Sequence, residues 1–150
     1  MPSKIPSKEV ADLLKGLYCE DLSDWQTISS SRFALEIENG LMNADGVYCK
    51  LFLKLHYFHN PKIKLKSYTL SIFRKSIYGS ELVYQLDIVQ PPKALKDLHK
   101  YPHEHFGDLR EFGTEEWLTW SFDEAINYFL SRTGITILGN LDPPDIYKLT

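Results

Sequence analysis

The sequence predicts an α+β fold with an antiparallel sheet of about four to five strands, connected as a meander. An N-terminal helix and a C-terminal amphipathic helix are expected to pack on one face of this sheet. Two patterns lead to this prediction: four consecutive segments with alternating apolar residues, and helical apolar spacing near both ends of the chain. With 150 residues, 43% of them hydrophobic, the chain suits a single domain over 1–150 with a loose tail from about residue 140.

The first helix is expected over residues 7–18. Ser7 follows Pro6 and is a suitable N-cap, whereas Gly16 weakens the last turn. Four apolar residues recur at the spacing of one helical face, namely Val10, Leu13, Leu14 and Leu17. This stripe is expected to contribute to the core.

Two strands are predicted next, over 32–38 and 47–58. Each alternates between apolar and polar side chains, as a half-buried strand does. The loop at 39–46 is rich in Asn, Asp and Gly, which tolerate positive φ and favour a reversal of the chain. The two strands are therefore expected to pair as antiparallel neighbours.

A third strand is predicted over 63–74 and a fourth over 81–89. The apolar positions of the third change parity partway along, so we expect a β-bulge near Lys66 or Ser67. Pro91 ends the fourth strand, because proline has no N–H to donate to a sheet ladder.

The clearest helix begins after Ser121. Ser121 and Glu124 form the capping-box pattern, and Gly134 is the expected stop. Between them the apolar residues follow helical spacing, so this helix should cover the apolar face of the sheet. Residues 135–138 are expected to add a short edge strand.

Charge is unevenly distributed along the chain. The whole chain carries −3, but residues 47–80 hold seven basic residues and no acidic one, so the rest carries −10. A basic face can steer polyanions such as RNA toward the protein. In the alternative interpretation, the basic sheet and the acidic C-terminal part simply neutralise each other across the fold.

The expected compartment is the cytoplasm, with no membrane partner. The first ten residues lack the apolar core of a secretory signal, and the longest apolar runs are far too short to span a bilayer. Cys19 and Cys49 follow no metal or redox spacing and are expected to be free thiols.

Leu98–Phe112 is the segment richest in chemically active side chains. It holds three of the five histidines, His99, His103 and His105, within seven residues. Pro102 excludes a helix through this segment, because a helix interior does not tolerate proline. In an extended backbone His103 and His105 point to the same face, with their side chains about 7 Å apart.

Two same-side imidazoles suit two chemistries. One is acid–base cleavage of a phosphodiester, in which one imidazole accepts the 2′-hydroxyl proton and the other protonates the leaving oxygen. The other is metal binding, as in a metal-dependent hydrolase. Further ligands for that metal would come from His99, Asp87, Asp108 or Glu111. A third interpretation gives the histidines only a structural role.

Two resemblances follow from these residues. His103, His105 and Glu111 resemble the His-x-His-(x)n-Glu element of cupin barrels, although the spacing to the glutamate is longer and a second histidine motif is missing. Pro102-His103-Glu104-His105, preceded by a strand containing Asp87 and followed by one C-terminal helix, resembles small prokaryotic and phage proteins with a Pro-His-x-His signature. These include the TumE-like toxins of toxin–antitoxin operons. The second resemblance implies a compact α+β fold that cleaves or modifies RNA.

The leading hypothesis is a toxin-like endoribonuclease that needs no cofactor. His103 and His105 would form the acid–base pair, Asp87 or His99 would orient one imidazole, and Arg110 would stabilise the phosphorane. The residues expected to hold RNA are Lys54, Lys62, Lys64, Lys66 and Arg74, with Tyr57 or Tyr68 stacking a base.

A second hypothesis, from a different class, is a non-catalytic binding protein or inhibitor of phage or antitoxin type. It would act on a cognate protein partner, an antitoxin or an inhibited target, through its charged surface. The histidines would then be structural. Either hypothesis is compatible with a dimer.

Overall fold

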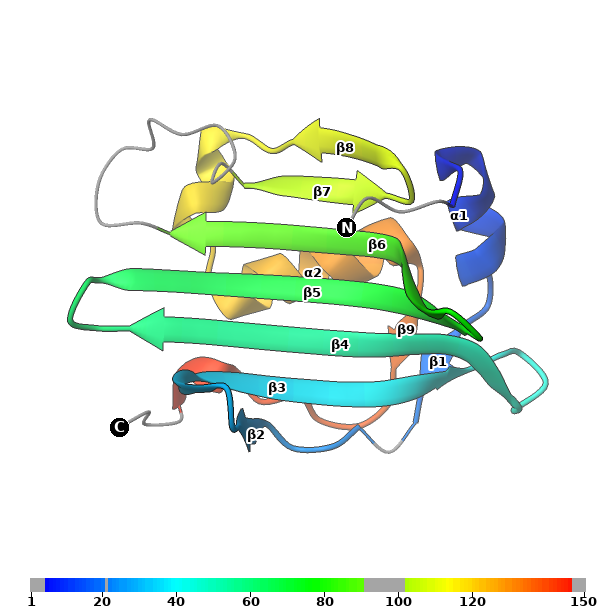
Figure 1. The fold of residues 1–150 in the computed structure, drawn as a ribbon, viewed down its shortest axis with the longest axis horizontal. Coiled ribbons are helices and arrows are strands. Elements are labelled where there is room, and N and C mark those ends of the chain that lie inside the picture. Colours follow the sequence, from blue (N-terminus) through cyan, green and yellow to red (C-terminus); the bar gives the residue numbers. More distant parts are fainter. Residues whose placement is uncertain (1–4, 21, 91–101, 147–150) are drawn as a thin grey trace.

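The computed structural model describes residues 5–20, 22–90 and 102–146, which build one mixed nine-stranded sheet and two α-helices (Figure 1). Along the sheet the strand order is β8-β7-β6-β5-β4-β3-β1-β9, and β2 pairs separately with β3. The prediction of a four- to five-stranded antiparallel sheet is therefore wrong in strand number. It is also wrong in type, because β1 and β9 are parallel.

The predicted meander forms the centre of this sheet. Its four long strands are antiparallel neighbours in sequence order, and all but β5 are longer than the apolar alternation indicated. Their bounds are β3 Ser31–Met42, β4 Tyr48–Asn60, β5 Leu65–Ser76 and β6 Gly79–Gln90. Short turns join them, so neighbouring strands pair with little loop-closure cost.

The predicted bulge is misplaced. Pairing of β4 with β5 runs without interruption from Leu65 to Arg74, past Lys66 and Ser67. Of the two apolar residues with the earlier parity, Ile63 lies in the β4–β5 turn and Leu65 is the first residue of β5, only partly buried. The register instead shifts between Ile72 and Phe73 where β5 pairs with β6.

Five short strands were not predicted as part of the meander. They are β1 Tyr18–Cys19, β2 Gln26–Ile28, β7 His103–Phe106, β8 Leu109–Phe112 and β9 Thr136–Ile137. The extended backbone expected at His103 and His105 is confirmed as β7, and the edge strand expected within 135–138 is confirmed as β9. Strand β8 was not predicted.

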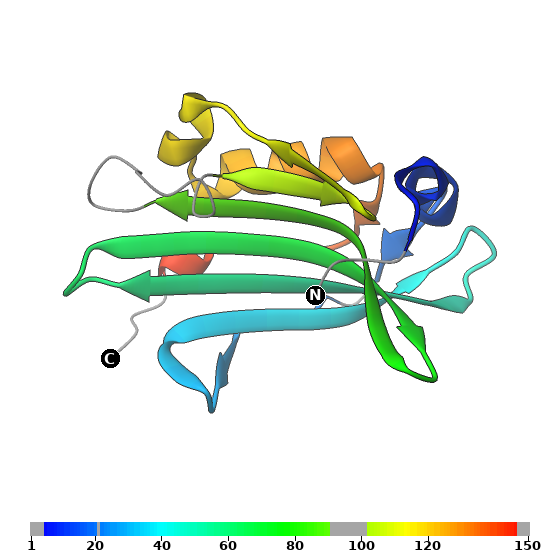
Figure 2. The same cartoon turned by 45° about the horizontal axis from the view of Figure 1, so that its top comes forward.

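One face of the sheet is covered by α2 (Phe122–Thr133), as Figures 1 and 2 show. Its predicted N-terminus is confirmed, because Ser121 and Glu124 form a full capping box and Gly134 ends the helix with φ +71°. Aromatic side chains join helix and sheet: Tyr68 packs on Phe122 with ring centroids 5.7 Å apart. This face of the sheet is the main core.

The N-terminal helix α1 (Ser7–Leu14) is shorter than predicted and begins differently. Pro6 is its N-cap residue, and no side chain caps it. The Ser7 backbone N–H instead donates to Asp108 Oδ1 over 3.0 Å, which ties α1 to the β7–β8 turn. Neither helix of the described ranges is long and apolar enough to cross a membrane.

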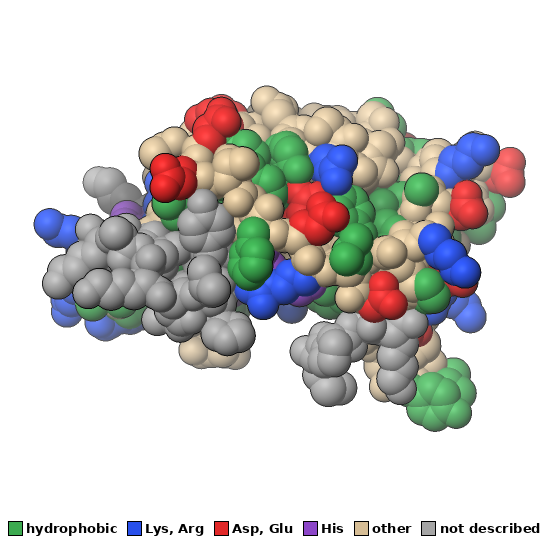
Figure 3. All heavy atoms as spheres, turned by 90° about the horizontal axis from the view of Figure 1, so that it is seen from above, with side chains coloured by type: hydrophobic (Ala, Val, Ile, Leu, Met, Phe, Trp, Pro, Cys, Tyr) green, Lys and Arg blue, Asp and Glu red, His purple; other side chains and the backbone are tan. Residues whose placement is uncertain are grey.

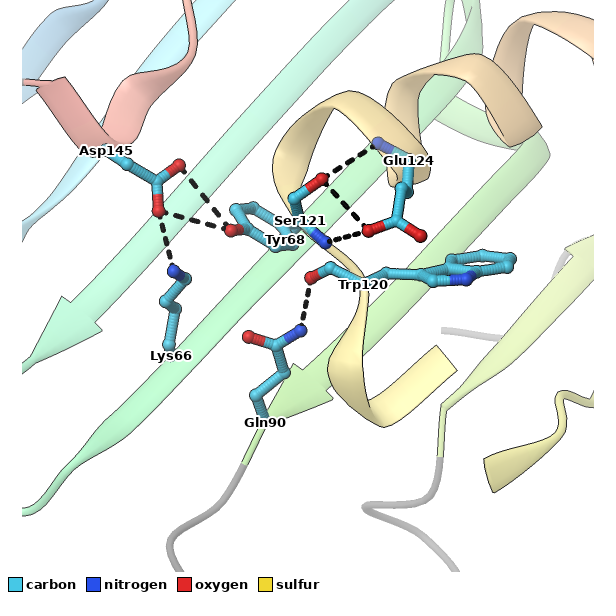
Figure 4. A network of polar contacts seen from close by, with 7 residues as sticks. All are labelled: Lys66, Tyr68, Gln90, Trp120, Ser121, Glu124 and Asp145. Atoms are coloured by element: carbon cyan, nitrogen blue, oxygen red, sulfur yellow. Dashed lines mark hydrogen bonds and ion pairs between the residues drawn. The ribbon is translucent and has the colours of Figure 1, made fainter. Parts of the chain in front are cut away.

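The segment expected to be a loose tail is held against the sheet as far as the structure describes it. The short 3-10 helix η3 (Pro144–Ile146) brings the Asp145 carboxylate within 2.6 Å of Lys66 Nζ, and Tyr68 donates to the same carboxylate (Figure 4). The indole N–H of Trp25 donates to the Asp142 carbonyl over 2.8 Å. These contacts extend the packed region to at least Asp145.

The second face of the sheet, which we call the open face, carries polar side chains in cross-strand rows. No helix of the described residues lies over it (Figure 1). Directly paired residues of antiparallel strands point to the same side, so the register defines each row. One row is Glu36, His56, Thr69, Asp87 and His103; the next is Glu38, Lys54, Ser71, Gln85, His105 and Arg110.

Candidate active site on the open face

Strand β7 places the predicted histidine pair beside Asp87. In the β6–β7 ladder His103 lies opposite Asp87, with Nε2 of the imidazole 3.7 Å from Oδ2 of the carboxylate. The Thr69 hydroxyl, on the other side, donates to Oδ1 of Asp87 over 3.3 Å. The three side chains form a continuous polar chain across β5, β6 and β7.

His105 is the second imidazole of this site. Its ring is perpendicular to that of His103, and the centroids lie 4.9 Å apart. Arg110 on β8 lies opposite His105 and therefore on the same face. Burial, together with the nearby His103 and Arg110, lowers the pKa of His105 to about 4. His105 is thus a neutral imidazole at neutral pH and can accept a proton.

The environment of Asp87 differs from that of a surface carboxylate. Burial raises the pKa of Asp87, and this effect is opposed by His103, by the Thr69 hydrogen bond and by Arg110. The carboxylate can still balance the charge of a protonated His103 imidazole at 3.7 Å. The two histidines consequently have different surroundings, one beside a carboxylate and the other beside a guanidinium.

The packed side of β7 is fixed to α2 through Glu104. This residue alternates with the histidines and is only 2% exposed. Its carboxylate accepts from Nε and Nη2 of Arg132, over 3.1 and 3.0 Å, and from the Tyr128 hydroxyl over 2.5 Å. Because Glu104 lies between His103 and His105 in the chain, these bonds also hold the strand segment that carries the two imidazoles.

The β7–β8 turn is held from two directions. Gly107 adopts φ +55°, and its N–H donates to the Val83 carbonyl over 2.7 Å. The neighbouring Asp108 N–H donates to the Ile5 carbonyl over 2.8 Å. A β-carbon on Gly107 would lie 2.2 Å from the Ile5 oxygen, so only glycine fits here. The turn determines how Arg110 faces His105.

The lowered pKa of His105 makes stability pH-dependent. Between about pH 6.5 and about pH 4 the unfolded chain protonates this imidazole and the folded chain does not. The free energy of unfolding is therefore expected to fall as pH decreases through this window. Urea unfolding of the wild type and of His105→Asn, which cannot titrate, should show a shallower pH dependence for the variant. Identical slopes would contradict the assignment.

The predicted RNA-binding residues are not gathered around the histidines. Lys54 lies on the open face, where its Nζ is 3.8 Å from Glu36 Oε2. Lys62 and Lys64 are exposed at the β4–β5 turn, and Arg74 pairs with Glu81. Lys66 binds Asp145 on the side of the sheet that α2 covers.

Tyr57 and Tyr68 cannot stack on a base in this structure. Their rings are 2% and 0% exposed and stack on each other in the core, with centroids 5.7 Å apart. The base-stacking role predicted for them is therefore corrected. Tyr57 and Tyr68 share the parity of Leu55 and Leu70 in their strands, so they lie on the face of the sheet that α2 covers. The alternation of the sequence already indicated this face.

The described residues provide no set of ligands for the metal-binding alternative. In those ranges no group of three His, Cys, Asp or Glu side chains is placed to hold a metal ion. Asp108 accepts from the Ser7 backbone, and Glu111 lies opposite Glu104, away from the histidines. His99 lies outside the described residues.

The edge of the sheet beside the site is mixed in charge. Figure 3 looks onto this edge and shows acidic, basic and hydrophobic side chains interspersed, with histidine atoms next to those of Lys or Arg. Arg110 and Phe112 of β8 are both exposed, and the guanidinium lies 5.2 Å from the centre of the Phe112 ring. The described side chains of this view form no large surface of one charge.

Thr69, Glu104 and Gly107 are the positioning residues that the sequence prediction missed. Gly107-Asp108 is a common hairpin-turn dipeptide and could have revealed β8. Comparison with protein families, curated proteins and solved structures found no match to this chain. The resemblance to Pro-His-x-His proteins therefore stays a prediction.

Proposed function

We propose that the protein cleaves RNA phosphodiester bonds by acid–base catalysis on the open face. The observation that carries this proposal is the pairing of Asp87 with His103 directly beside a second imidazole, His105, in a different electrostatic environment. Two titratable groups in unlike surroundings are the usual arrangement for a separate acid and base.

In the proposed reaction His105 is the general base. Its neutral imidazole takes the proton of the ribose 2′-hydroxyl, whose oxygen attacks the adjacent phosphorus. His103, protonated and balanced by Asp87, gives its proton to the leaving 5′-oxygen. Arg110, opposite His105 on β8, neutralises charge on the phosphorane. The products are a 2′,3′-cyclic phosphate and a free 5′-hydroxyl, so atoms and protons balance.

The decisive experiment measures cleavage of an end-labelled single-stranded RNA by the purified protein. The double variant His103→Ala, His105→Ala should lose cleavage by at least about 100-fold, because each imidazole supplies a proton-transfer step. His59→Ala is the matched control: His59 lies on β4 beside Tyr57, with ring centroids 6.3 Å apart, and should cleave like the wild type.

Circular dichroism and thermal unfolding establish that the double variant is folded. Cleavage that persists in a folded double variant would show that other groups, or a contaminating nuclease, perform the reaction. Expression in bacteria gives an independent measurement, because a toxin of this mechanism should stop growth and the double variant should not. A wild type that binds RNA without cleaving it would instead favour the binding-protein hypothesis.

A further inference from the structure

A hollow of about 220 Å³ lies on the open face next to the candidate active site. It spans strands β3 to β6, and its lining residues are Glu36, Lys54, His56, Thr69, Ser71, Phe73 and Gln85. Two of these connect it to the catalytic side chains: Thr69 donates to Asp87, and Gln85 lies opposite His105 in the ladder. The hollow and the imidazoles therefore belong to one continuous surface.

The floor of the hollow is a pair of neutral hydrogen-bonding groups. Ser71 is only 2% exposed, and the Gln85 amide N–H donates to its Oγ over 2.9 Å. This bond uses one amide proton of Gln85. It leaves the Ser71 hydroxyl its own proton and leaves Gln85 its carbonyl oxygen as an acceptor. A donor and an acceptor side by side match the polar edge of a nucleobase.

One wall of the hollow is an aromatic ring in a fixed position. Phe73 stacks on Phe52 across the β4–β5 ladder, with centroids 5.5 Å apart and planes 22° from parallel. Lys75 Nζ lies 5.1 Å from the centre of the Phe52 ring on the same strand pair. An immobilised ring beside a polar floor can stack on a base while the floor binds its edge.

The rim of the hollow is balanced in charge. Glu36 Oε2 lies 2.6 Å from Nδ1 of His56 and 3.8 Å from Nζ of Lys54. The Glu36 carboxylate and the two side chains that contact it therefore lie together on one side of the hollow. A carboxylate at this rim disfavours a phosphate group there. The rim therefore suits an uncharged planar ligand, with any phosphate lying toward His103 and Arg110.

We propose that this hollow is a base-binding subsite for the nucleotide whose phosphate is cleaved at the histidine pair. The proposal rests on the function proposed above and names the part of the substrate that Ser71, Gln85 and Phe73 recognise. Strands lie about 4.8 Å apart, so the middle of the hollow on β5 is about 10 Å from the histidine strand β7. One nucleotide can bridge this distance.

The test measures binding of the four nucleoside 3′-monophosphates, which need no catalysis, by titration in nuclear magnetic resonance or calorimetry. At least one should bind, and both Ser71→Ala and Gln85→Leu should reduce the ratio of Kd values between the best and worst base by about tenfold. Ser67→Ala is the matched control on the same strand and face but outside the hollow, and its ratio should be unchanged.

The outcomes separate this proposal from the proposed function. If binding is base-selective and depends on Ser71 and Gln85, but the protein does not cleave RNA, the result supports the subsite and rejects the nuclease activity. If the protein cleaves RNA but neither substitution changes its base preference, the subsite is rejected and the proposed nuclease activity stands. If none of the monophosphates binds, the subsite is rejected whatever the cleavage assay shows. Titration with inorganic phosphate measures how much of the monophosphate binding comes from the phosphate group alone.

Discussion

Replacing Glu104 by alanine is expected to lower the free energy of unfolding by about 3 kcal/mol. The carboxylate is 3% exposed and accepts three hydrogen bonds, two from Arg132 and one from Tyr128. Removing it leaves the Tyr128 hydroxyl and the guanidinium without this acceptor. The loss lies at the low end of the range for buried ion pairs, because the Arg132 side chain is 42% exposed and can regain water.

The same substitution should also reduce the RNA cleavage proposed above, because Glu104 anchors the strand that carries both imidazoles. Glu111→Ala is the matched control: Glu111 lies opposite Glu104 on β8 but is exposed, so its removal should change stability by less than about 0.5 kcal/mol. Urea unfolding of both variants measures the difference. Equal stabilities would mean that β7 is held to α2 by apolar packing alone.

Replacing Gly107 by alanine is expected to destabilise the protein by about 3 kcal/mol. Part of the cost is conformational, because L residues with a side chain rarely adopt φ +55°. The larger part is steric, since the new methyl group would lie 2.2 Å from the Ile5 carbonyl oxygen. The backbone would have to move and would strain the hydrogen bonds from Gly107 to Val83 and from Asp108 to Ile5.

Gly134→Ala separates the two contributions. Gly134 also has a positive φ, +71°, but no neighbouring atom lies within 4 Å of a β-carbon built there. Its substitution should cost about 1 kcal/mol, the conformational part alone. Thermal unfolding of both variants measures the difference between them. Equal losses would show that the segment at Ile5 adjusts freely and does not constrain the β7–β8 turn.

The parts of the fold that could be predicted are those with a long periodic pattern. Strands β3 to β6 are twelve or thirteen residues long and alternate over much of that length, and α2 carries both a capping box and a terminal glycine. The short strands β1 and β2 have two or three residues each, too few for a period to be recognised. Their pairing depends on tertiary contacts between segments that are far apart in the sequence.

The candidate site was predictable for a similar reason. A period of two residues already places His103 and His105 on one face, and the structure places the predicted Asp87 opposite His103 on the neighbouring strand. The positions of the basic residues could not be predicted from charge alone, because the seven cations spread along two strands and a turn point in different directions. The aromatic ring of Tyr57 by itself suggests base stacking, but its parity with Leu55 indicates the face of the sheet that α2 covers.

The edges of the sheet have a consequence for solubility. Long strands with free backbone groups readily pair with other molecules and start aggregation. Here the edge strand β8 has four residues and carries both Arg110 and Glu111, while β9 has two residues. The outer side of β3 pairs with β2 near one end and with β1 near the other, and between them Ser23 donates to the side chain of Asn39. The apolar strands of the meander are thereby shielded from pairing with a second molecule.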